Sequence, residues 1–255
     1  RHGDTASAPE GRGTGGSRSL AVGGSAILQA TGKVREKARR IAAHLLEAAF
    51  EDVDLVDGRY QVKGVPARSL TLAQIADRAY GEGLPPGIES GLEASDFFRP
   101  PQLVYPFGAH VAVVEMDRET GVVRVRDYFS VDDCGRRITP NLVAGQVHGG
   151  LAQGIAQALL EELVYGPDGQ LVTGSLMDYC VPRADDVPAF VTDQTVTPTP
   201  FNPMGAKGIG EAATIGSTPA IVNAVMDALR PFGVRHLDMP LRPERVWQAM
   251  QAGRP

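Results

Sequence analysis

A single carboxylate follows a glycine-rich stretch, which is a suitable place to hold a general base. Glu211 ends the segment Gly205-Ala206-Lys207-Gly208-Ile209-Gly210-Glu211. Glycine permits backbone angles that are closed to other residues, and it lets the backbone approach a ligand closely. Ser217, with Pro219 two residues on, predicts a helix that begins just after this segment. The spacing indicates either a base held against a buried ligand or a flexible turn with a solvated glutamate, and both readings stay open.

A second glycine-rich stretch, near the N-terminus, carries the groups of an anion site. Residues Thr14-Gly15-Gly16-Ser17-Arg18-Ser19 combine hydroxyls, one guanidinium and backbone amides, which could cradle phosphate oxygens. The same region fits G-x-G-x-x-G over 11–16, with Glu36 twenty residues beyond. A dinucleotide-binding fold needs an apolar strand just before that pattern, and Ala6-Ser7-Ala8-Pro9-Glu10 is not a strand. We therefore reject that fold and keep two readings, an anion cradle and a disordered tail.

The apolar periodicity predicts the helices and strands that must position these two loops. Helices are expected at about 24–50, 72–80, 141–163 and 242–250 and from 217 onward. One hairpin is expected over 54–62, with the turn Asp57-Gly58, and a second hairpin is expected from strands 109–116 and 122–129. Residues 178–182 and 189–196 are also expected to be extended. Hairpins that alternate with separate helices predict an α+β fold with mixed and antiparallel sheets and amphipathic helices. We expect two subdomains, about 1–105 and 106–255.

The helix expected over 141–163 is rich in small residues in its N-terminal half. Each glycine there costs roughly 1 kcal/mol of helix propensity, so we expect a close neighbour or ligand as the reason. Gln146 and His148 lie on these turns and could present an amide and an imidazole, although each alone reads as an ordinary surface residue. His110 reads as a strand residue and Cys134 as a small buried residue.

Composition excludes several function classes. The chain has 255 residues, a formal net charge of -5 and two cysteines. The acidic balance argues against a nucleic-acid partner. No apolar run reaches the roughly 20 residues of a membrane span, and no secretory signal is visible. Two lone cysteines favour a reducing, cytoplasmic setting and form no metal-ligand pair. Because the chain opens without methionine, we expect a fragment, a processed piece or half of a split subunit.

Three blocks, in family order, carry a resemblance to a known enzyme family. The first runs from Gly3-Asp4-Thr5 to Ser19, the second from Val131-Asp132-Asp133-Cys134-Gly135 to Gly154, and the third is Lys207-Gly208-Ile209-Gly210-Glu211. With these blocks the chain resembles the C-terminal part of the molybdenum-binding large subunit of the xanthine oxidase family of molybdenum hydroxylases. It looks most like the carbon monoxide dehydrogenase and bacterial aldehyde dehydrogenase branch.

The resemblance implies roles for individual residues. Thr14, Gly15, Gly16, Ser17, Arg18 and Ser19 match the family block that wraps the molybdopterin cofactor, and Ile209 and Gly210 match a further cofactor contact. Gln146 matches a glutamine beside the oxygen ligands of molybdenum, and Glu211 matches the general base. The pterin dithiolene holds the metal in this family, so no protein metal ligand is expected. The cofactor is expected to be molybdopterin cytosine dinucleotide.

The resemblance also implies partners. It implies an upstream half of the large subunit, an iron–sulfur subunit and an FAD subunit, and without that upstream half the chain is expected to be inactive. The substrate stays open among carbon monoxide, aldehydes, purines and other N-heterocycles, and so does the presence of copper. The competing hypothesis is a non-catalytic fragment or scaffold module without cofactor. A nucleotide-binding domain is a third class, and it fails on the missing strand and the missing P-loop lysine.

Overall fold

The computed structural model describes residues 4–8, 10–11 and 13–253, so Gly3 of the first motif lies outside the described residues. The chain divides into two compact units, one of residues 22–100 and one of residues 1–21 together with 101–255. The sequence therefore leaves the second unit at residue 22 and returns to it at residue 101. The subdomain boundary expected near residue 105 stays a prediction.

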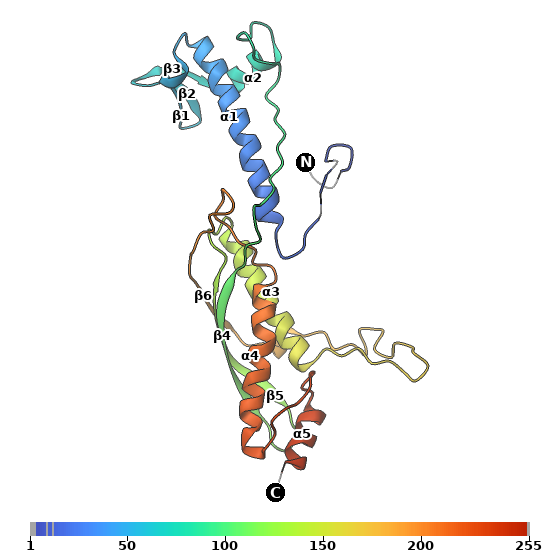
Figure 1. Ribbon diagram of the computed structural model, residues 1–255. Helices are drawn as coiled ribbons and strands as arrows, with labels where there is room; N and C mark the ends of the chain where they lie inside the picture. Colours follow the sequence, from blue (N-terminus) through green and yellow to red (C-terminus); the bar gives the residue numbers. More distant parts are fainter. Residues whose placement is uncertain (1–3, 9, 12, 254–255) are drawn as a thin grey trace. The chain divides into compact units, whose positions relative to one another are not determined.

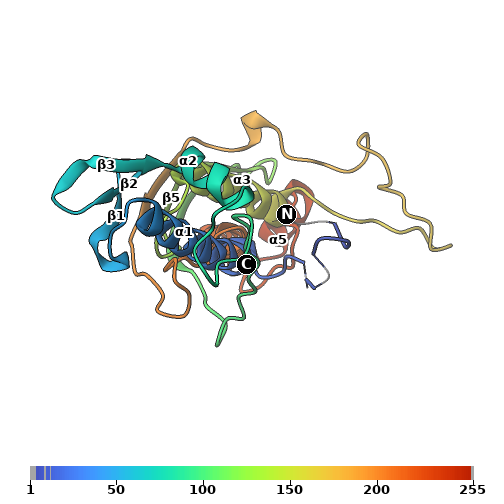
Figure 2. The same cartoon turned by 90° about the horizontal axis from the view of Figure 1, so that it is seen from above.

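The unit of residues 22–100 is a small sheet packed against two helices (Figures 1 and 2). Its elements are α1 (Ser25–Leu45), β1 (Val53–Val56), β2 (Arg59–Val62), β3 (Val65–Thr71) and α2 (Leu72–Tyr80). The strands form an antiparallel meander in the order β1-β2-β3. Ala38, Ile41 and Ala42 of α1 are fully buried against this sheet and α2. The structure confirms the predicted helices and the Asp57-Gly58 turn, and it adds β3.

Helix α1 ends earlier than the periodicity predicts. Glu47, two residues after the last helical residue, has a φ of 48°, which is the left-handed region and stops the helical hydrogen-bond ladder. Helix α2 begins with a capping box, in which Thr71 and Gln74 satisfy each other's backbone amides. Its predicted bounds are confirmed.

The other unit is a mixed three-stranded sheet with two long helices on one face (Figure 1). Its elements are β4 (Phe107–Met116), β5 (Val123–Asp133), α3 (Pro140–Leu159), β6 (Phe190–Gln194), α4 (Ala212–Leu229) and α5 (Pro243–Ala252). Strand β5 pairs antiparallel with β4 and parallel with β6. The core lies between the sheet and the two helices, and Tyr128, Leu151, Ile155, Ile221 and Val225 are completely buried in it. The α+β fold with mixed and antiparallel sheets is confirmed.

Short turns of helix complete the described chain: η1 (Leu20–Gly24, π-helical), η2 (Phe50–Asp52), η3 (Ala184–Asp186) and η4 (Arg230–Phe232). Between α3 and η3, a long loop within residues 160–183 extends away from the rest of its unit in both views (Figures 1 and 2). Across the described residues, no helix combines the length and the apolar character that crossing a membrane requires.

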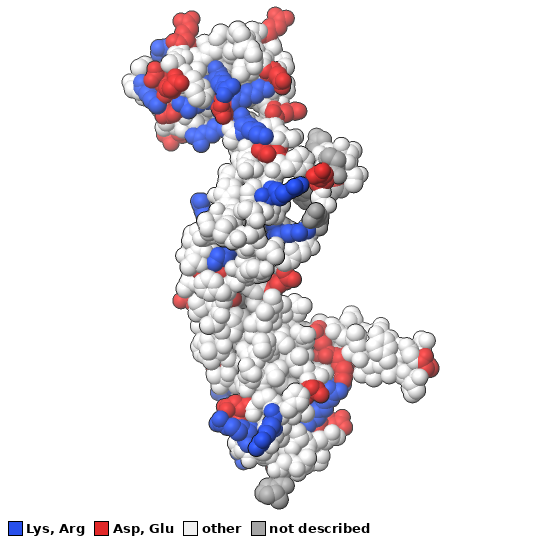
Figure 3. All heavy atoms as spheres, viewed as in Figure 1, with Lys and Arg blue, Asp and Glu red and all other residues white. Residues whose placement is uncertain are grey.

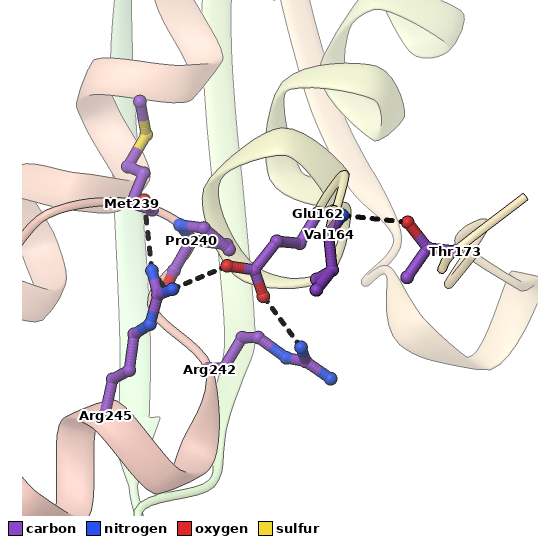
Figure 4. A network of polar contacts seen from close by, with 7 residues as sticks. All are labelled: Glu162, Val164, Thr173, Met239, Pro240, Arg242 and Arg245. Atoms are coloured by element: carbon purple, nitrogen blue, oxygen red, sulfur yellow. Dashed lines mark hydrogen bonds and ion pairs between the residues drawn. The ribbon is translucent and has the colours of Figure 1, made fainter. Parts of the chain in front are cut away.

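An ionic contact ties the end of α3 to the region of α5 (Figure 4). The Glu162 carboxylate accepts hydrogen bonds from Arg242 Nη1 at 2.7 Å and Arg245 Nη2 at 2.5 Å. The bond from Arg242 and the nearby charge of Arg245 lower the pKa of Glu162. Helix α3 ends at Leu159, four residues short of the prediction, because the Leu160 and Glu161 amides both turn back to the Ala156 carbonyl.

Candidate functional site

The two glycine-rich loops meet, although they lie at opposite ends of the sequence. The Ser17 hydroxyl donates a hydrogen bond of 2.8 Å to Glu211 Oε2, across 194 residues of chain. A Cβ placed on Gly210 would lie 2.9 Å from Ser17 Oγ and 3.8 Å from Gln146 Oε1. The N-terminal loop, the first half of α3 and the segment before α4 thus converge at Gly210 and Glu211.

Close packing explains why glycines precede Glu211. A Cβ on Gly208 would lie 2.6 Å from Ser17 Cβ and 2.7 Å from the Ser17 carbonyl oxygen, closer than Cβ atoms are found in proteins. Only a residue without a side chain lets the two loops approach this closely. Ser17 itself has a φ of 57°, and the neighbouring Gly16 has a φ of 64°. Two successive left-handed residues turn the N-terminal loop sharply at the contact.

The remaining groups of the N-terminal loop turn back on the loop itself. The hydroxyls of Thr14 and Ser19 form a hydrogen bond to each other. Arg18 donates from Nε and Nη2 to the Gly13 carbonyl oxygen at 3.2 and 3.1 Å. A Cβ on Gly15 or Gly16 would meet nothing within 4 Å, so the backbone there borders open space.

The glycines of α3 lie in two different environments. A Cβ on Gly150 would lie 2.7 Å from Ala213 Cβ, and one on Gly154 would lie 1.8 Å from Ser217 Oγ. These two glycines let α3 and α4 pack closely. A Cβ on Gly145 or Gly149 would meet nothing within 4 Å. Gln146, which is exposed, lies between these two open positions.

Helix α4 corrects one prediction. The helix begins at Ala212, directly after Glu211, so Ser217 is not its N-cap and Pro219 lies inside it. Ser217 is completely buried, and its hydroxyl donates to the Gly150 carbonyl oxygen at 3.2 Å. The turn before Pro219 stays helical because it packs against α3. Glu211 therefore stands at a helix N-terminus, where the helix dipole favours a carboxylate, and Ile209 packs against the core of the unit.

A buried ion pair anchors the loop that leads to Glu211, and the sequence patterns do not reveal it. Lys207 Nζ lies 3.1 Å from Asp133 Oδ1, and the Asp133 side chain is fully buried. Asp133 also accepts hydrogen bonds from the Gly135 amide at 2.8 Å and the Thr195 hydroxyl at 2.9 Å. Burial alone would raise the pKa of Asp133, but hydrogen bonds from the Gly135 amide, Lys207 and two threonine hydroxyls lower it to about 2. Asp133 and Lys207 lie in the second and third of the family blocks, and only folding brings them together.

A second buried polar group lies under α4. His110 is the strand residue that was predicted, but its ring is held by Tyr128 Oη at 2.9 Å and by Asp132 Oδ1 at 3.3 Å. A Cβ on Gly216 of α4 would lie 2.7 to 2.9 Å from the imidazole ring, so the helix crosses directly over it. Burial, together with the nearby Asp132 carboxylate, raises the pKa of the Tyr128 phenol. Cys134 is buried, as predicted.

The helices beside the site carry almost no charge. Helix α3 contains no Lys, Arg, Asp or Glu, and Asp227 is the one such residue in α4. Figure 3 shows the corresponding pale surface over these helices. Within the described part of the chain, no three His, Cys, Asp or Glu side chains gather as metal ligands would. The donors available near Glu211 are hydroxyls, an amide side chain and backbone N–H groups.

Comparison with known proteins connects this geometry to one family. The sequence model of the family described as "Molybdopterin cofactor-binding domain" matches residues 1–188. The carbon monoxide dehydrogenase large chain of Hydrogenophaga pseudoflava is 46% identical over 249 residues, which are 98% of this chain and 31% of that protein.

Two solved structures have the same fold over nearly the whole chain. CO dehydrogenase from Oligotropha carboxidovorans superposes with a TM-score of 0.90 at 40% identity, covering 98% of this chain and 31% of that one. Quinoline 2-oxidoreductase from Pseudomonas putida 86 gives a TM-score of 0.87 at 43% identity, covering 96% and 31%. The chain thus spans about a third of the length of these relatives. It belongs to the family of molybdopterin cofactor-binding domains and corresponds to part of the molybdenum-binding large subunit of the xanthine oxidase family.

Proposed function

We propose that this chain forms one wall of the molybdopterin site of a molybdenum hydroxylase and supplies its general base, Glu211. The observation that carries the proposal is the meeting of three distant segments at one carboxylate. Ser17 donates to Glu211, and Gln146 comes within 3.8 Å of a Cβ position on the neighbouring Gly210. A carboxylate that a hydroxyl holds in one orientation, beside an amide, can take up a proton at a fixed point.

The open backbone around Glu211 fits a large, flat, anionic cofactor. Gly15, Gly16, Gly145 and Gly149 all border space that a Cβ would enter without contact. A ligand could therefore approach the backbone at each of these positions. Hydroxyls, amides and a guanidinium in residues 14–19 are suited to phosphate oxygens, in keeping with a pterin dinucleotide such as the cytosine form.

In this proposal each residue has a distinct task. Glu211 accepts the proton of the water-derived nucleophile, and Ser17 keeps the carboxylate oriented. Gln146 would donate its amide N–H to the bound group, while residues 14–19 together with Ile209 and Gly210 would hold the pterin. When bound, the molybdenum cofactor supplies the two-electron oxidation of the substrate.

The substrate class and partners follow from the family as further proposals. We place the substrate among carbon monoxide, aldehydes and N-heterocycles, because the similar proteins include a CO dehydrogenase and a quinoline oxidoreductase. The working enzyme would comprise the rest of the large subunit, an iron–sulfur subunit and an FAD subunit. Two free cysteines, one of them exposed, favour the cytoplasm as its location.

Two experiments test this proposal. Native mass spectrometry with molybdenum analysis, on material from the natural source, should find the chain with pterin and molybdenum. In the complete enzyme, Glu211→Gln should keep the molybdenum content and lower turnover by roughly 100-fold or more. Glu119→Gln, an exposed glutamate in the β4–β5 turn, is the matched control and should leave turnover unchanged. Normal turnover in Glu211→Gln would defeat the assignment of the base.

A further inference from the structure

Lys207 stands in the glycine-rich segment before Glu211, where a lysine would be expected to serve an anion, yet its side chain is 9% exposed. The ammonium donates to Asp133 Oδ1 at 3.1 Å and to Thr197 Oγ1 at 2.8 Å. It also lies 4.6 Å from the centroid of the Phe107 ring, within the range of a cation–π contact. These interactions engage the ammonium inside the protein, so it is unsuited to a cofactor phosphate.

Asp133 is a rigid partner for this lysine. It is the last residue of β5 and is paired in register with Phe107 of β4. Its two carboxylate oxygens are both engaged, Oδ1 by the Gly135 amide and Lys207 and Oδ2 by the Thr195 hydroxyl. A buried carboxylate with all of these bonds has little freedom to move.

The backbone of the same segment is fixed at the same place. The Lys207 amide donates to the Cys134 carbonyl oxygen at 2.8 Å, and the Arg136 amide donates to the Gly205 carbonyl oxygen at 2.9 Å. Residues 205–207 therefore continue alongside the chain that leaves β5. The Lys207 side chain and main chain form one anchor on the sheet.

The far side of Glu211 has an anchor of its own. Ala213 is completely buried and faces Gly150 of α3. Residues 208–212 thus span the interval between Lys207 and Ala213. Two of these five residues are glycines, which permit the contact with Ser17 but add no side-chain restraint. The position of the Glu211 carboxylate consequently depends on the two anchors, together with the packing of Ile209 and the hydrogen bond from Ser17.

We propose that Asp133 and Lys207 are positioning residues, which set the location of Glu211 from inside the protein and make no contact with the cofactor. The reactive consequence rests on the proposed role of Glu211 as base. A displacement of about 1 Å at a catalytic group can cost about 100-fold in rate. Losing this anchor should therefore affect the chemical step more than the binding of substrate.

Hydrogen exchange on the 255-residue chain tests the anchor without any cofactor. Asp133→Asn should speed the exchange of amides 208–212 by about 10-fold or more, because the lysine bond weakens, and leave amides 221–229 of α4 nearly unchanged. Glu162→Gln is the matched control, since it removes the ion pairs with Arg242 and Arg245 in the same unit. It should speed exchange near 160–164 and leave 208–212 unchanged.

A second variant guards against misfolding. Asp133→Asn combined with Lys207→Met removes both charges, so no buried charge is left unpaired. The same local increase over 208–212 is expected from it. If exchange over 208–212 is unchanged in both variants, or rises equally throughout the unit, the anchor is refuted.

Assays of the complete enzyme distinguish a failure of the positioning role from a failure of the proposed function. Asp133→Asn should keep its molybdenum and lower kcat by about 100-fold, with KM within about threefold of the parent. Faster loop exchange with unchanged kcat would overturn the positioning role. If Glu211→Gln keeps full turnover, the base assignment fails, whereas the exchange result still decides whether Asp133 and Lys207 anchor the loop.

Discussion

Two glycines on one helix should respond differently to the same substitution. Gly149 and Gly154 both lie in α3. Replacing either by alanine improves helix propensity by about 1 kcal/mol. At Gly149 the new methyl meets nothing within 4 Å, so the gain should appear as increased stability of that size.

At Gly154 the same methyl would meet α4. Its Cβ would lie 1.8 Å from Ser217 Oγ and 2.9 Å from both Ser217 Cβ and the Thr218 backbone nitrogen. Rotating the serine does not relieve the contact, because a backbone atom is also involved. Overpacking of this kind costs about 1 to 3 kcal/mol. Because the propensity term is common to both variants, their free energies of unfolding should differ by this steric cost of about 1 to 3 kcal/mol.

Urea unfolding followed by tryptophan fluorescence measures this difference. The chain has one tryptophan, Trp247 in α5, and it belongs to the same unit as α3. The Gly149→Ala midpoint should lie above that of the parent protein, and the Gly154→Ala midpoint well below that of Gly149→Ala. Equal midpoints for the two variants would refute the close contact between Gly154 of α3 and Ser217 of α4.

Further outcomes are expected from the charges and loops. Since its hydrogen bonds lower the pKa of Asp133 from 3.8 to about 2, it should contribute about 2 kcal/mol of stability above pH 4. That stability is lost as pH falls from about 4 to 2. The stability of the Asp133→Asn variant should not show this loss in acid unfolding curves. A pH dependence parallel to that of the parent protein would contradict the lowered pKa of Asp133. Gly208→Ala should separate the N-terminal loop from Glu211 and so speed amide hydrogen exchange over residues 14–19. Unchanged amide exchange in these residues would refute the contact between Gly208 and Ser17. Replacing Ser17 and Ser19 with bulky residues should lower the pterin content of the complete enzyme, and unchanged content would count against the cradle.

The sequence by itself determined the local elements and the family motifs. Apolar spacing is a local property, so the helices at 72–80 and 243–252 and the paired strands β4 and β5 could be predicted from it. The turn at Asp57-Gly58 could be predicted because few residue pairs accept two left-handed angles in succession. Motif spacing likewise led to Glu211 and to residues 14–19.

Tertiary packing decided the start of α4. The pattern Ser217-x-Pro219 is a good local start signal, but close contact with Gly150 and Gly154 keeps the preceding turn helical. The free energy gained by burying that turn exceeds the local preference of Ser217 and Pro219 for a helix start. Sequence spacing contains no information about this burial. The start of the helix in turn places Glu211 at its N-terminus.

Tertiary structure alone also decided which groups hold the candidate base. Ser17 donates to Glu211 across 194 residues, and Asp133 binds Lys207 across 74. The residue types show only that these groups can form hydrogen bonds and ion pairs. Which of them meet depends on the sheet register that ends β5 at Asp133 and on the contacts of α3 with α4, because these long-range contacts set the distances between the groups.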